Sequence, residues 1–200
     1  SDDTDAAERV KIQYGTSMCY PVSSMGSHVS VVPNHQLNRK TPLHTRANVA
    51  YFGTFGYELD LNKLSYEEIS EVKQQIAFMK EYRELIQFGT FYRLKSPFEG
   101  NETAWMTVSE DKKTALVFWY RERNVVNADF TRVRLQGLDP DFIYRNEYNG
   151  TENYGDELMN LGLLTTDCTA GEPTSEDAPC TDYESRIYVL TTVARIPSPL

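Results

Sequence analysis

The densest group of reactive side chains lies at the start of the chain, in Ser1-Asp2-Asp3-Thr4-Asp5. Carboxylates crowded in this way repel one another, which raises the pKa of at least one of them and leaves it protonated at mild pH. A neutral carboxylic acid can act as a general acid, as in the cleavage of a glycosidic bond. The same segment precedes Ala6-Ala7-Glu8, so it also matches a helix N-cap. Both interpretations can hold together, with one aspartate capping the helix and another reacting.

The remaining reactive residue types give weaker patterns. The spacings of His28, His35 and His44 fit no pair of metal ligands on one helix, so we expect structural hydrogen bonds from them. The sequence contains no CxxC or HExxH pattern, and we therefore expect no metal site.

Three cysteines are too few for a disulfide framework. Cys19, next to Tyr20-Pro21, is expected to be a buried thiol. Cys168 and Cys180 flank a loop rich in Thr, Glu, Pro and Ser, and they would pair only in an oxidising compartment.

Composition excludes several classes of protein. The chain has 200 residues, a formal net charge of −9 and no long apolar run, so we expect neither a membrane span nor binding to nucleic acid. Residues 1–96 are electrically balanced, whereas residues 97–200 carry the whole acidic excess. Within them, residues 139–184 form an acidic block in which Arg145 is the only base, which indicates a solvated acidic face.

The elements that must position the acidic cluster follow from the periodicity of residues 1–96. Helices are predicted at residues 5–14, at 41–51 and at 65–88, the last with Ser65 and Glu68 as a capping box. A short buried strand is predicted at residues 28–33.

After residue 96 the pattern changes to a period of two. Strands are predicted at residues 104–108, 115–120, 130–135, 142–144, 157–159 and 186–193. Trp105, Trp119 and Tyr120 lie in these strands, where core packing is favoured over stacking on sugar rings. The pattern is typical of an antiparallel β-sandwich. We therefore expect two domains, an α/β domain at residues 1–96 and an all-β domain at residues 97–200.

Long segments of the chain closely resemble α-galactosidases of glycoside hydrolase family 36. The similarity begins with the whole run of residues 1–17 and extends over nearly the entire chain, with the exception of residues 165–183. It is carried by residues 21–30, 33–35, 52–61, 87–94, 96–101, 104–111, 135–140 and 155–160.

The resemblance implies a fold and a role for one residue. Enzymes of this family combine a (β/α)₈ barrel with a C-terminal β domain, so residues 1–96 would be the last barrel units and residues 97–200 the C-terminal antiparallel β-sandwich. In the family, the first aspartate of the Ser-Asp-Asp/Asn-Thr-Asp motif is the general acid/base, which corresponds to Asp2. The implied substrates are terminal α-linked galactosides such as melibiose and raffinose, cleaved with retention. The residues that bind the sugar are not identified by the resemblance.

The nucleophile of the family lies in a Lys-Trp-Asp-Met-Asn-Arg motif that these 200 residues do not contain. We therefore expect a fragment of a retaining α-galactosidase that supplies the acid/base and is inactive alone. The alternative is a non-catalytic β-sandwich module that binds carbohydrate or supports a partner domain. The family resemblance further implies no cofactor, a homotetrameric parent enzyme and a cytoplasmic, bacterial location.

Overall fold

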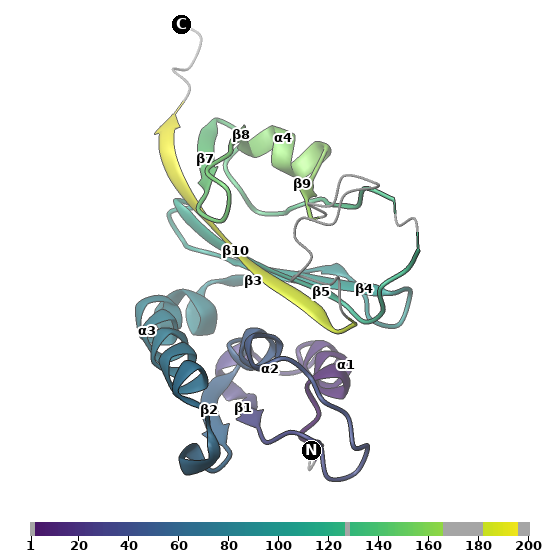
Figure 1. The fold of residues 1–200 in the computed structure, drawn as a ribbon. Helices are drawn as coiled ribbons and strands as arrows, with labels where there is room; N and C mark the ends of the chain where they lie inside the picture. Colours follow the sequence, from purple (N-terminus) through teal and green to yellow (C-terminus); the bar gives the residue numbers. More distant parts are fainter. Residues whose placement is uncertain (1–2, 127–128, 166–181, 196–200) are drawn as a thin grey trace, which may run out of the picture. The chain divides into compact units, whose positions relative to one another are not determined.

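The computed structural model describes residues 3–126, 129–165 and 182–195. They form two compact units, Ser1–Gly89 and Thr90–Leu200. Helices and parallel strands build the first unit, and antiparallel strands build most of the second (Figure 1). The predicted domain boundary at residue 96 stays a prediction.

The first unit alternates helices and strands. In chain order its elements are α1 (Ala6–Thr16), the 3₁₀ turn η1 (Val22–Ser24), β1 (Gly26–Ser30), α2 (Leu43–Ala50), β2 (Thr54–Glu58), the 3₁₀ turn η2 (Leu61–Lys63) and α3 (Tyr66–Phe88). Strands β1 and β2 are parallel and pair from Gly26 opposite Thr54 to Ser30 opposite Glu58. Parallel neighbours require a crossover, which α2 provides. This β1–α2–β2 unit is the arrangement expected for the end of a barrel.

The helix signals in the sequence are confirmed. The hydroxyl of Ser65 accepts a hydrogen bond from the Glu68 amide at 3.2 Å, and the Glu68 carboxylate accepts one from the Ser65 amide at 2.8 Å. This capping box starts α3 where the sequence predicted it. The predicted strand is found two residues earlier, as β1, whereas β2 was not predicted because Gly53 and Gly56 dilute its β-branched and aromatic pattern.

The second unit is built on a six-stranded antiparallel sheet with the order β3-β4-β5-β10-β7-β8. The long strand β10, yellow in Figure 1, lies between β5 and β7. The bounds of the six strands are β3 (Thr90–Lys95), β4 (Glu102–Val108), β5 (Thr114–Arg121), β7 (Phe142–Asn146), β8 (Glu152–Tyr154) and β10 (Glu184–Arg195). A small second sheet pairs β6 (Arg132–Val133) with β9 (Leu163–Leu164), and α4 spans Gly155–Asn160.

The core of the second unit lies between one face of the large sheet and the segments around β6, β9 and α4. Alternate residues of β4 and β5, such as Met106 and Trp119, pack there with Val133, Leu158 and Leu163. A largely antiparallel β domain with sandwich-like packing is thereby confirmed, and it also contains the short helix α4.

Of the three aromatic residues considered for sugar stacking, Trp119 belongs to this core, whereas Trp105 and Tyr120 alternate with core residues and lie on the opposite face of the sheet. Trp105, Trp119 and Tyr120 are each no more than 2% exposed. The Trp105 and Phe118 rings stack with their centroids 4.3 Å apart.

Two predicted strands of this unit differ from the structure. Residues 157–159 are helical and belong to α4, because Asp156 and Glu157 favour a helix N-terminus and a three-residue apolar run does not distinguish helix from strand. Of the predicted strand 130–135, only Arg132–Val133 pairs with another strand, whereas the Leu135 amide donates to the Leu158 carbonyl at 3.0 Å.

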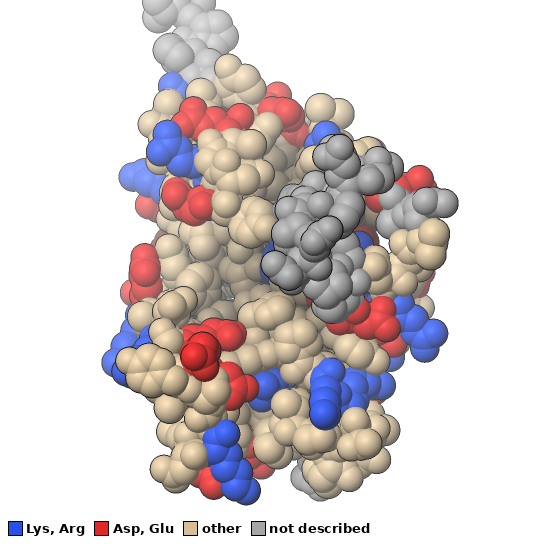
Figure 2. All heavy atoms as spheres, in the orientation of Figure 1, with Lys and Arg blue, Asp and Glu red and all other residues tan. Residues whose placement is uncertain are grey.

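In the part of the chain that the structure describes, no helix has the length and apolar character needed to cross a bilayer. Acidic and basic side chains are interspersed on the face that Figure 2 shows.

Candidate active site

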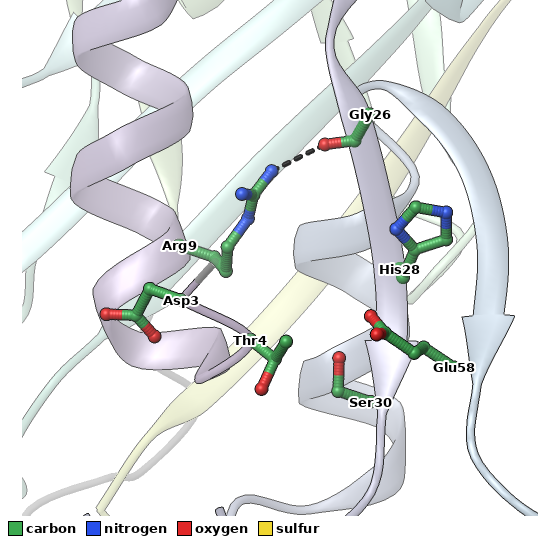
Figure 3. Close-up of a pocket in the computed structure, with 7 residues that line it drawn as sticks. All are labelled: Asp3, Thr4, Arg9, Gly26, His28, Ser30 and Glu58. Atoms are coloured by element: carbon green, nitrogen blue, oxygen red, sulfur yellow. Dashed lines mark hydrogen bonds between the residues drawn. The ribbon is translucent and has the colours of Figure 1, made fainter. Parts of the chain in front are cut away.

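A cavity of about 210 Å³ lies in the first unit, between the start of α1 and strands β1 and β2. Its lining consists of Asp3, Thr4, Arg9, Gly26, His28, Ser30 and Glu58 (Figure 3). Ser30 and Glu58 are the last residues of their strands. In barrel enzymes the active site lies at this carboxyl end of the strands.

The pleat of β1 determines which of its side chains face the cavity. Gly26, His28 and Ser30 lie at alternate positions and line it, whereas Ser27 and Val29 are buried at the positions between them. His28 is paired in register with Gly56 of β2. A Cβ atom at residue 56 would lie 2.8 Å from Cδ2 of His28, so glycine at this position leaves room for the imidazole.

The position of α1 against the strands is fixed by one buried amide. The Nε2 group of Gln13 donates to the Val49 carbonyl at 2.9 Å and to the Phe52 carbonyl at 3.1 Å. Its Oε1 atom accepts a hydrogen bond from the Ser27 hydroxyl at 2.7 Å. Gln13 is 3% exposed, and an unpaired amide at this depth would cost free energy, so α1 has one favoured position relative to β1 and α2.

The carboxylates of the acidic segment ahead of α1 accept hydrogen bonds from different backbone amides. Asp5 is the N-cap of α1, and its Oδ2 atom accepts a hydrogen bond from the Glu8 amide at 3.1 Å. The Oδ1 atom of Asp3 accepts one from the Asp5 amide at 2.9 Å. The helix-cap interpretation is therefore confirmed for Asp5. Asp2 lies outside the described residues, and its covalent neighbour Asp3 lines the cavity.

A hydrogen bond from the positively charged Arg9 connects α1 to β1. Arg9 donates through Nη2 to the Gly26 carbonyl at 2.5 Å, as the dashed line in Figure 3 marks. Burial lowers the pKa of the Arg9 guanidinium, and the negative charge of Asp3 opposes this shift. Arg9 remains positively charged at any physiological pH, so it supplies a fixed charge beside the acidic segment.

The cavity is suited to a polar ligand with many hydroxyl groups. It combines two carboxylates, an imidazole, two hydroxyls and a guanidinium, a mixture of hydrogen-bond donors and acceptors. These residues therefore offer groups that could hydrogen-bond the hydroxyls of a sugar.

Several residues of this cavity were not predicted from the sequence. His28 was expected to make structural hydrogen bonds, and Thr4, Arg9, Ser30 and Glu58 were not predicted as site residues. The alternation of His28 and Ser30 on a strand was a usable signal, whereas the contributions of Arg9 and Glu58 depend on contacts between distant elements.

Other expectations concerned cysteine and metal. Cys19 is exposed, so its assignment as a buried thiol was wrong. Cys168 and Cys180 lie outside the described residues. Within residues 3–126, 129–165 and 182–195, no group of three or more His, Cys, Asp and Glu side chains is placed to hold a metal ion.

Comparisons with known families account for both units. Residues 1–89 match the family model described as Melibiase, and residues 102–190 match the model for the glycosyl hydrolase family 36 C-terminal domain. The chain belongs to glycoside hydrolase family 36.

Family 36 relatives are similar over most of this chain. Alpha-galactosidase AgaA of Geobacillus stearothermophilus is 56% identical over 163 residues, which is 82% of this chain and 22% of AgaA. Alpha-galactosidase Mel36A of Lactobacillus acidophilus is 50% identical over the same share of the chain and 22% of its own length. The chain thus spans about a fifth of the length of these relatives.

Solved family 36 structures confirm the fold class. A crystal structure of the Lactobacillus brevis alpha-galactosidase superposes with a TM-score of 0.89 at 44% identity, covering 100% of this chain and 26% of that enzyme. AgaA with bound 1-deoxygalactonojirimycin gives a TM-score of 0.88 at 49% identity, covering 96% and 25%. The chain therefore consists of the last units of a (β/α)₈ barrel followed by a C-terminal β domain.

Proposed function

We propose that these 200 residues are the C-terminal part of a retaining α-galactosidase, in which Asp2 is the general acid/base. The observation that carries this proposal is the cavity that runs along β1 to the carboxyl ends of β1 and β2, where it is bordered by Asp3 and Thr4. These residues continue the Ser-Asp-Asp-Thr-Asp motif directly from Asp2. Family 36 membership supplies the role that the motif's first aspartate would play.

The hydrogen bonds of the other two aspartates support this assignment. Asp5 caps α1, and Asp3 holds the amide of Asp5, so both carboxylates already have structural partners. This agrees with the interpretation from the sequence in which one aspartate caps the helix and another reacts.

In the proposed mechanism Asp2 acts twice. As a carboxylic acid it protonates the glycosidic oxygen while an aspartate of the preceding part of the enzyme attacks the anomeric carbon. As a carboxylate it then removes a proton from the water that releases galactose from the enzyme. Retaining enzymes hold two such carboxyl groups about 5–5.5 Å apart. Two carboxylates suffice for this chemistry, and no cofactor is included in the proposal.

The substrate class is proposed from the relatives. Crystal structures of AgaA variants have been solved in complex with raffinose and with stachyose. We propose terminal α-linked galactose of such oligosaccharides as the substrate, with His28, Ser30 and Glu58 among the groups near its hydroxyls.

The stereochemistry of the product tests the proposed function. The full-length enzyme is expected to release α-galactose first from melibiose, because two displacements at the anomeric carbon restore its configuration. Proton NMR during the first minutes of the reaction distinguishes the two anomers before mutarotation mixes them. Release of β-galactose, or no hydrolysis at all, would reject a retaining α-galactosidase.

Four features of the whole protein belong to the same proposal. Residues 1–96 would be the end of the catalytic barrel and residues 97–200 the C-terminal domain. AgaA and Mel36A both come from bacteria, which supports a bacterial enzyme. A cytoplasmic location and a tetrameric assembly are proposed on the family resemblance alone.

A further inference from the structure

The loop between β1 and α2, residues 31–42, contacts the acidic segment that begins α1. Arg39 donates through Nη1 to Oδ2 of Asp5, and the same nitrogen lies 3.5 Å from Oε1 of Glu8. The Asp5 side chain is only 1% exposed, so the ion pair is largely withdrawn from water. Charge-assisted hydrogen bonds in such surroundings are among the stronger ones in proteins.

The loop is folded so that Arg39 is held in place. Asn34 is 3% exposed, and its Oδ1 atom accepts hydrogen bonds from the amides of Gln36 and Leu37, each at 2.9 Å. The Asn34 amide donates to the Arg39 carbonyl at 2.9 Å, which closes the turn. Its side-chain Nδ2 group also donates to the Thr4 hydroxyl at 3.3 Å, a second contact with the acidic segment.

Both ends of this loop are fixed by one buried side chain of α2. Arg46 donates to the Ser30 carbonyl at 2.6 Å and to the Thr41 carbonyl at 3.2 Å. Arg46 is 6% exposed. These hydrogen bonds fix the position of the loop relative to the end of β1. Through Asn34 and Arg39, the loop in turn contacts Thr4 and Asp5.

We infer that Arg39 is a positioning residue for Asp2 and that it acts through Asp5. The inference rests on the proposed function, because it takes Asp2 as the acid/base. Asp2 precedes Asp5 by three residues, and consecutive Cα atoms are about 3.8 Å apart, so a shift of Asp5 reaches Asp2 within a short stretch of backbone. A displacement of about 1 Å in a catalytic group can cost about 100-fold in rate.

The test compares two substrates in the full-length enzyme carrying Arg39→Met. Raffinose needs protonation of its leaving group, whereas 2,4-dinitrophenyl α-galactoside does not. The ratio of kcat/KM for raffinose to kcat/KM for the aryl galactoside is expected to fall about tenfold or more. Because both constants are measured on one preparation, the ratio does not depend on the fraction of enzyme that folds.

Two further variants sharpen the result. Arg39→Lys keeps a positive charge near Asp5 and is expected to restore part of the ratio. Lys40→Met removes the same charge from the neighbouring, exposed position of the loop, and we expect it to change the ratio less than about twofold. The inference would be overturned if the ratio in Arg39→Met is unchanged. Equal losses on both substrates would then indicate a merely structural role, and no loss on either would indicate no role.

The variant Asp2→Asn separates the inference from the proposed function. If Asp2→Asn lowers the ratio and Arg39→Met does not, the positioning role of Arg39 is wrong and the proposed function stands. If Asp2→Asn also leaves the ratio unchanged, the assignment of Asp2 fails, and the inference about Arg39 fails with it.

Discussion

Replacing Asp2 with asparagine in the full-length enzyme is expected to lower kcat/KM for raffinose by about 10²–10⁴-fold. Asparagine cannot donate a carboxylic proton to the leaving sugar, so departure of a poor leaving group loses its acid catalyst. The kcat/KM for 2,4-dinitrophenyl α-galactoside is expected to fall far less, because this leaving group departs without a proton. Steady-state kinetics on both substrates, with wild-type and variant enzyme, measure the difference.

The matched control for this prediction is Asp3→Asn. The amide oxygen of asparagine can still accept the hydrogen bond that Asp3 receives from the Asp5 amide. We therefore expect the ratio of the two kcat/KM values to change less than about tenfold in this variant. Near-normal hydrolysis of raffinose by Asp2→Asn, or a ratio that falls further in Asp3→Asn than in Asp2→Asn, would reject Asp2 as the acid/base.

The isolated 200-residue chain is expected to hydrolyse no α-galactoside at a measurable rate, even one with an activated leaving group. A double displacement needs two carboxylates, and the motif that holds the nucleophile of the family is absent from these residues. Release of dinitrophenolate by the purified chain, compared with the full-length enzyme at equal concentration, measures this effect.

Two controls make that result interpretable. Near-ultraviolet circular dichroism of the isolated chain establishes that its aromatic core is packed. The isolated chain carrying Asp2→Asn gives the background rate from contaminating enzymes. Hydrolysis above this background by the wild-type chain would show that the 200 residues contain a complete catalytic site, which contradicts the account.

The alternative of a carbohydrate-binding module receives no support from Trp119, one of the aromatic residues considered for stacking on sugar rings. Trp119 is packed in the core of the second unit, and a sugar platform needs an exposed ring face. The polar groups suited to a sugar lie instead in the first unit, beside Asp3 and His28. This distribution favours a catalytic fragment over a binding module.

Much of the fold could be predicted where local pattern and tertiary structure agree. The capping box of Ser65 and Glu68 marks the start of α3, and the period of two in residues 104–108 and 115–120 gives β4 and β5. These signals depend on neighbouring residues alone, so a single sequence contains them. The helix α4 was missed because its short apolar run fits either period.

The candidate site was less predictable for a physical reason. The acidic segment was recognisable from its composition, and the helix cap at Asp5 followed from position. The partner of Asp5 is Arg39, 34 residues later, and no local pattern indicates this ion pair. His28 faces the cavity because its neighbour in register is Gly56, a relation that only the pairing of β1 with β2 reveals.

Azide rescue tests the central claim most directly. The full-length enzyme carrying Asp2→Ala is incubated with 2,4-dinitrophenyl α-galactoside and sodium azide, and the galactosyl azide is identified by NMR. If Asp2 is the acid/base, azide accelerates turnover, because it attacks the galactosyl-enzyme without needing a base, and the product is α-galactosyl azide. Formation of β-galactosyl azide would make Asp2 the nucleophile, and absence of any acceleration would remove it from the second step. Either result would contradict the account.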